Sequence, residues 1–176
     1  MSAAVRMRLL CQDAEDWSAR VEAALRRHDI AVVADDAGAD GLDVPSLVLF
    51  DALSMDVSAS VRELSAGGRN RTFAIAVCHH GLGDDGPWQL LRSGASDAFA
   101  WDDEDEPSER IVARLERWTK IDAVVRAPAL RRELAGESPR WLACLRQAAE
   151  IALFSDGPVL LLGESGTGKE IGRAHV

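Results

Sequence analysis

The chain has 176 residues, 47% of them apolar and 28% charged, which is typical of a soluble globular protein with a core of normal size. Its formal net charge of −9 argues against a nucleic-acid-binding surface in this piece, because such surfaces are usually basic. No apolar run approaches the ~18 residues of a membrane span, so we expect a cytoplasmic protein without membrane contacts. Cys11, Cys78 and Cys144 are far apart and flanked by apolar residues, which predicts reduced cysteines in the core.

Apolar segments and turn residues alternate along the first two thirds of the chain. The predicted strands are 5–11, 30–34, 46–50, 73–78 and 97–101. The predicted helices are 17–28, 57–66, 87–93 and 108–126, and 79–86 is expected to be a loop. This alternation predicts an α/β fold with a doubly wound, five-stranded parallel sheet covered on both faces.

Two acidic residues follow predicted strands, Asp13 after the first and Asp51 after the third. The carboxyl ends of parallel strands lie at one edge of the sheet, so we expect these side chains to be neighbours. Two carboxylates there could hold a divalent metal ion through their oxygens. The alternative is ordinary turn chemistry, since Asp is common after strands.

The order of elements over residues 5–120 resembles the receiver domain of two-component response regulators. The carrying segments are Leu9-Leu-Cys-Gln-Asp13, Ser46-Leu-Val-Leu-Phe-Asp51 and Gly94-Ala-Ser-Asp-Ala-Phe99. The resemblance implies that Asp51 is the candidate phosphoacceptor and that Asp13 and Asp51 are candidate metal ligands.

Several receiver positions carry other residues. Gln12 replaces one metal carboxylate, Cys78 stands for the hydroxyl residue after strand four, and Trp101-Asp102 stands where the family has a lysine and a proline. The lysine should neutralise phosphoryl charge, and Trp101 cannot do so. We therefore favour a degenerate receiver that dimerises or senses a ligand or protein over ordinary phosphorylation at Asp51. An unrelated α/β domain remains the third alternative.

The helix predicted at 108–126 has apolar residues on one stripe. They are Ile111, Leu115, Trp118, Ile121 and Val125. The stripe can pack on its own domain or pair with a second copy, as the linker helix commonly does in receivers coupled to motor domains. Pro128 is expected to end this helix, which divides the chain into a domain at 1–126 and a linker at 127–137.

A second unit is predicted to begin at Ser138, a good N-cap, followed by Pro139 at the first helical position. After this helix, 159–162 is predicted to be a short buried strand that leads into a glycine-rich loop. The loop residues, which fit a phosphate-binding pattern, are Gly163, Glu164, Ser165, Gly166, Thr167, Gly168, Lys169 and Glu170. Backbone N–H groups of such a loop surround a β-phosphate, and Lys169 would reach the β- and γ-phosphates.

Residues 134–170 closely resemble the start of the AAA+ domain of sigma-54-dependent transcriptional activators, including Glu170 where other phosphate loops have Ser or Thr. The resemblance implies ATP and Mg²⁺ as cofactors of the parent protein. It also implies, as partners of the parent, RNA polymerase holoenzyme carrying sigma-54 and promoter DNA. The chain lacks the family's Walker B segment, sigma-54-contacting loop and arginine finger, so we expect no ATPase activity from this piece.

The tail 171–176 departs from that family and resembles the translation of a common sequencing adapter. We therefore expect a truncated regulator of sigma-54-dependent transcription, with 138–170 as the AAA+ fragment. One alternative is a stand-alone dimerisation or sensing module whose phosphate loop is an inert remnant. Another is a small nucleotide-binding enzyme that uses the loop together with Asp13 and Asp51.

Overall fold

The protein is described by a computed structural model that covers residues 3–34, 44–101, 107–157, 160 and 162–164. Its strands are β1 (Ala3–Leu10), β2 (Ile30–Ala34), β3 (Ser46–Phe50), β4 (Thr72–Ala76) and β5 (Asp97–Ala100). Its helices are α1 (Ala14–Arg26), α2 (Met55–Ser65), α3 (His79–Leu82), α4 (Gly86–Arg92), α5 (Pro107–Arg126), α6 (Pro128–Glu133) and α7 (Pro139–Phe154). None of the helices in these ranges is long and apolar enough to cross a membrane.

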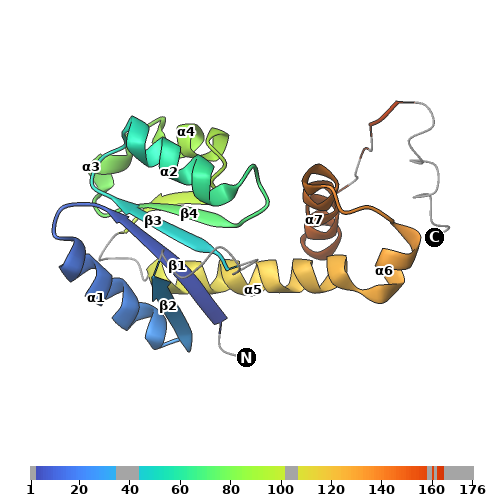
Figure 1. The fold of residues 1–176 in the computed structure, drawn as a ribbon, viewed down its shortest axis with the longest axis horizontal. Helices are drawn as coiled ribbons and strands as arrows, with labels where there is room; N and C mark the ends of the chain where they lie inside the picture. The colour runs from blue at the N-terminus through green and yellow to red at the C-terminus, as the bar shows by residue number, and fades with distance from the viewer. Residues whose placement is uncertain (1–2, 35–43, 102–106, 158–159, 161, 165–176) are drawn as a thin grey trace.

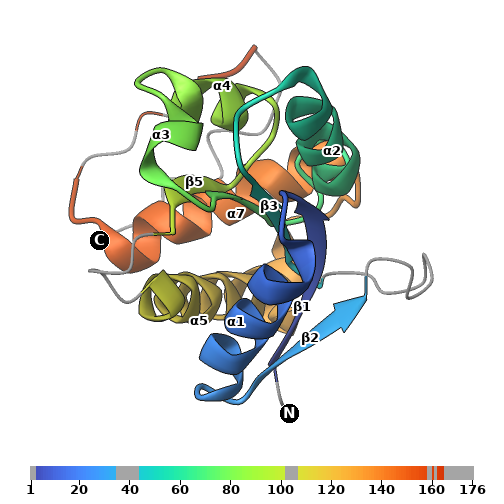
Figure 2. The same ribbon diagram turned by 90° about the vertical axis from the view of Figure 1, so that its left-hand side faces the viewer.

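The strands form one five-stranded sheet in the order β2-β1-β3-β4-β5, and every neighbouring pair is parallel. This is the order of flavodoxin-like folds, in which ligands bind where the strand order reverses, here between β1 and β3. The predicted α/β class and five-stranded parallel sheet are confirmed. Helices α1 and α5 cover one face, and α2, α3 and α4 lie on the other (Figures 1 and 2).

The continuous apolar run of β3 serves two cores. Leu47 and Leu49 pack on the α1 and α5 side, whereas Val48 and Phe50 pack on the α2 and α4 side. All five residues of β3 are buried, as expected for a central strand with helices on both faces.

Strand β1 alternates instead. Val5 and Met7 are buried with α1 and α5, while the intervening Arg6 and Arg8 are partly exposed on the opposite face. Arg8 forms a two-point ion pair with Glu63 of α2, with N–O distances of 2.8 and 3.2 Å.

Two helices occur where the sequence predicted none. The expected loop 79–86 contains α3, and the expected linker 127–137 contains α6. Pro128 ends α5 and also occupies the first turn of α6, a position that needs no backbone N–H. Helix α1 begins three residues before its predicted start, with Asp13 in the N-cap position.

Helix α7 packs on α5, as Figure 1 shows, and its Leu145 and Ala149 belong to the same core as the α5 stripe. Ser138 caps it by accepting a hydrogen bond from the N–H of Trp141, as predicted. All five stripe residues are buried within the chain. The stripe therefore packs on its own sheet and on α7, and a second copy could reach it only by displacing α7.

Candidate functional site

The carboxyl edge of the sheet gathers the segments that follow β1, β3, β4 and β5. Asp51, directly after β3, is half-buried. Its Oδ2 accepts a hydrogen bond from the backbone N–H of Gln12, after β1, at 2.5 Å. A carboxylate that accepts a backbone N–H bond is held in one orientation. The end of β1 is thus tied to the end of β3 through the Asp51 side chain.

Asp13 lies at the same edge. It is exposed, has a left-handed backbone with φ 50°, and its side chain makes no capping hydrogen bond. Burial raises the pKa of the half-buried Cys11 thiol, and the negative charges of Asp51 and Asp13 raise it further. The residues Asp13 and Asp51 follow the paired strands β1 and β3, so both lie at the same edge of the sheet, as predicted.

The two carboxylates are an incomplete set of metal ligands. Mg²⁺ can be held by one or two carboxylates together with water and phosphate oxygens. Here one Asp51 oxygen already accepts the Gln12 N–H bond, and Gln12 brings no second acidic group. Within the described ranges, no three His, Cys, Asp or Glu residues come together as a metal site. We therefore derive no chemical step through a metal at this edge.

Trp101 occupies the end of β5. Its side chain is only 6% exposed and meets Trp17 of α1 edge to face, with 6.3 Å between ring centroids. The indole is part of the α1–α5 core and supplies no charge to the crevice. Asp102 lies outside the described residues. Lys120, the one lysine among the described residues, is exposed on α5.

The segment after β4, residues 78–81, is hydrogen-bonded to the backbone after β3, residues 51–53. The Cys78 thiol donates a hydrogen bond to the carbonyl oxygen of Asp51 at 3.6 Å, and the N–H of Leu53 donates to the carbonyl of Gly81 at 2.9 Å. A Cβ atom on Gly81 would lie 1.8 Å from the Asp51 carbonyl oxygen, so only glycine fits. Sequence reasoning missed Gly81, because nothing in the sequence around it shows what packs there.

The predicted core position is wrong for two of the three cysteines. Cys78 and Cys144 are exposed, whereas Cys11 is half-buried and packs against the α1–α5 core. Cys78 lies two residues beyond the end of β4, and Cys144 is an exposed residue of α7 next to the buried Leu145. Apolar sequence neighbours did not reveal these orientations, because adjacent residues on a helix or strand point in different directions.

The predicted strand before the phosphate loop is not formed at its described residues. Leu160 and Leu162 are 80% and 86% exposed and have no strand partner. A short strand needs a neighbouring strand for its backbone groups, and none of the five described strands pairs with it. Gly163 and Glu164 are exposed and irregular, and 165–170 lies outside the described residues, so the expected ATP-binding loop stays a prediction.

Comparison of the chain with protein-family models, curated proteins and solved structures found no match. The class of protein is therefore defined by its own geometry. It is an α/β protein with a parallel sheet in the flavodoxin-like order, an aspartate fixed at the end of β3, and a helical extension packed against α5.

Proposed function

We propose that this chain is the regulatory part of a sigma-54-dependent transcriptional regulator: a degenerate receiver-like domain joined to the opening of an ATP-binding AAA+ domain. The observation that carries the proposal is the loop Gly163–Glu170, with its Gly-Glu-Ser-Gly-Thr-Gly-Lys-Glu sequence. ATP with Mg²⁺, the sigma-54 holoenzyme and promoter DNA would be bound by the complete regulator in the cytoplasm. Residues 1–176 by themselves would have no ATPase activity.

The sheet supports the receiver-like half of the proposal. Its strand order places the end of β3 at the switch point where such folds bind ligands. Asp51 stands at that point and is oriented by the Gln12 N–H. The Trp101 indole, by contrast, favours a domain that signals without phosphoryl chemistry, since no described cation faces Asp51 from β5.

The contact between α5 and α7 supports a physical link between the two halves. Arg117 of α5 pairs with Glu150 of α7 at 3.0 Å, and Arg146 of α7 pairs with Asp122 of α5 at 2.9 Å. Arg146 also donates a hydrogen bond to the backbone carbonyl of Arg69, at the turn before β4. A change at the sheet can therefore reach the segment that leads to the phosphate loop.

Of the loop, the structure describes Gly163 and Glu164, and both are exposed. The residues that would hold ATP are the loop glycines, through backbone N–H groups, and Lys169, through its ammonium group. We derive no nucleotide-dependent step from this geometry and expect weak ATP binding by the isolated chain.

Sequencing of the parent locus in genomic DNA beyond the Lys169 codon tests the proposal directly. We expect an open frame that continues into an apolar strand ending in Asp-Glu and a Gly-Ala-Phe-Thr-Gly-Ala loop. Both are needed to hydrolyse ATP and to touch sigma-54 in the resembled family. A genomic stop codon directly after Val176 would contradict the proposal.

The second candidate function is a stand-alone dimerisation or sensing module with an inert phosphate-loop remnant. The exposure of Leu160 and Leu162 favours it, because a loop on an unpaired segment is poorly held. Addition of the downstream residues separates the two candidates. Tight ATP binding by the extended chain supports the first, and its absence supports the second.

A further inference from the structure

Strand β2 is an edge strand of the sheet. It pairs with β1 on one side, and no residue that the structure describes pairs with its other side. Its sequence, Ile-Ala-Val-Val-Ala, contains no charged residue and no proline. Most edge strands contain charged residues or proline, or are covered by another segment, because their free N–H and C=O groups can pair with another strand. Strand β2 contains neither charged residues nor proline.

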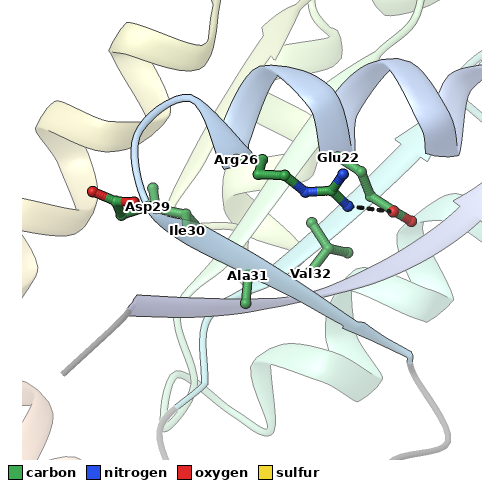
Figure 3. A pocket seen from close by; sticks show the side chains of 6 residues that line it. All are labelled: Glu22, Arg26, Asp29, Ile30, Ala31 and Val32. Atoms are coloured by element: carbon green, nitrogen blue, oxygen red, sulfur yellow. Dashed lines mark ion pairs between the residues drawn. The ribbon is translucent and has the colours of Figure 1, made fainter.

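A groove of about 290 Å³ runs along this edge between α1 and β2 (Figure 3). Its lining residues are Glu22, Arg26, Asp29, Ile30, Ala31 and Val32. Glu22 and Arg26 stand one helical turn apart and form a loose ion pair of 3.8 Å within the chain, with side chains 40% and 80% exposed. A strand added to the edge would therefore meet one acidic and one basic side chain of the same helix.

The spacing of these charges matches the strand beneath them. Glu22 and Arg26 are separated by four helical residues, a rise of about 6 Å. Ile30 and Val32 are separated by two strand residues, a rise of about 6.6 Å. Helix α1 runs opposite to β2, because it connects two parallel strands. A two-fold axis through Ala31 that exchanges Ile30 with Val32 would also bring Glu22 of one copy to Arg26 of the other.

We propose that β2 is a self-association surface for two copies of this chain. Two β2 strands pair antiparallel about an axis at Ala31 and join the two five-stranded sheets. Both α1 helices then lie on one face, with two Glu22–Arg26 ion pairs between the copies. The interface is isologous, which means that both copies use the same surface. One acidic and one basic residue per copy are therefore enough to form two complementary ion pairs. This is why a second copy fits the edge better than an unrelated extended peptide.

The proposed surface is separate from the α5 stripe, which is buried beneath α7. The self-association proposal does not rest on the proposed function.

Sedimentation equilibrium, at protein concentrations from micromolar to several hundred micromolar, measures the self-association. We expect a concentration-dependent dimer. Arg26→Glu places two glutamates opposite each other at both pairs and should weaken dimerisation about tenfold. The double variant E22R/R26E restores opposite charges across the axis and should recover most of the affinity.

Cross-linking tests the register. In a chain with Cys78→Ser and Cys144→Ser, Ala31→Cys places two cysteines directly opposite, about 4.5–5.5 Å apart between Cα atoms, within reach of a disulfide. Mild oxidation should give a covalent dimer, while Ala59→Cys, exposed on α2, should not. A monomer at every concentration overturns the proposal. So does a dimer that neither responds to Arg26→Glu nor cross-links through Ala31→Cys.

Discussion

Single residues decide the chemistry at the end of β3. Asp51 follows β3, and its Oδ2 accepts a hydrogen bond from the Gln12 N–H, while β5, two strands away in the sheet, is followed by the Trp101 indole. Trp101 cannot be exchanged for lysine without loss, because its ring is buried against Trp17. Truncation of a buried tryptophan removes about 3–5 kcal/mol of stability. A lysine at position 101 would therefore remove packing from the α1–α5 core and leave a cavity.

The substitution Gly81→Ala tests whether the close packing of α3 on Asp51 outweighs the higher helix propensity of alanine. Alanine in place of a helical glycine is favoured by about 1 kcal/mol. At Gly81 the added Cβ meets the Asp51 carbonyl oxygen, and α3 must shift. We expect a net destabilisation of about 1–3 kcal/mol, measured by urea unfolding. Gly86→Ala is the matched control, since its Cβ would make only ordinary contacts of 3.4 and 3.5 Å with leucine side chains. Equal effects of the two substitutions would show that α3 does not rest on Asp51.

At the scale of elements, α7 is attached to the sheet by charge as well as by apolar contact. Asp122 of α5 receives Arg146 at 2.9 Å and Arg71 at 3.8 Å, and all three side chains are largely buried. Burial lowers the pKa of Arg71, and the Asp122 carboxylate opposes that shift. The Arg71 guanidinium also lies 5.1 Å above the Trp118 ring. The cluster fixes α7 at one position along α5.

Arg146→Ala should loosen this attachment. It removes the ion pair with Asp122 and the hydrogen bond to the Arg69 carbonyl, and it leaves a largely buried carboxylate with the more distant Arg71. We expect a loss of about 2 kcal/mol in the free energy of unfolding. We also expect faster proteolysis between α6 and α7. Arg140→Ala, at the exposed start of α7, is the control. If both variants behave like the original chain, α7 is not docked through this cluster.

On the scale of the whole molecule, the sheet and α7 form one body around a shared core. The α5 stripe is enclosed by that body, whereas Asp51 is half-buried at the carboxyl edge and no described strand pairs with the outer side of β2. Under the proposed function, this arrangement would transmit a regulatory state through helix docking and self-association. Phosphoryl chemistry at Asp51 would then contribute little, since the described residues of the crevice include two carboxylates and no cation from β5.

Beryllofluoride with Mg²⁺ tests that view of the whole domain, because it mimics an aspartyl phosphate. We expect no tight binding at Asp51, since the position after β5 holds the Trp101 indole and no described cation there would balance the added charge. Isothermal titration calorimetry checks this, with a lysine-bearing receiver as positive control. Saturable micromolar binding that disappears in Asp51→Asn would show that the receiver chemistry is intact.

The sequence by itself determined the fold class. A strand that is buried on both faces needs a continuous apolar run, such as 46–50, and turn residues separate the predicted elements. It also placed Asp13 and Asp51 at one edge. Only the tertiary structure decided what each side chain meets: Trp101 against Trp17, Gly81 against the Asp51 backbone, and the α5 stripe beneath α7. These contacts join residues far apart in the chain. Local periodicity shows which face of an element is buried, but not which neighbour covers it.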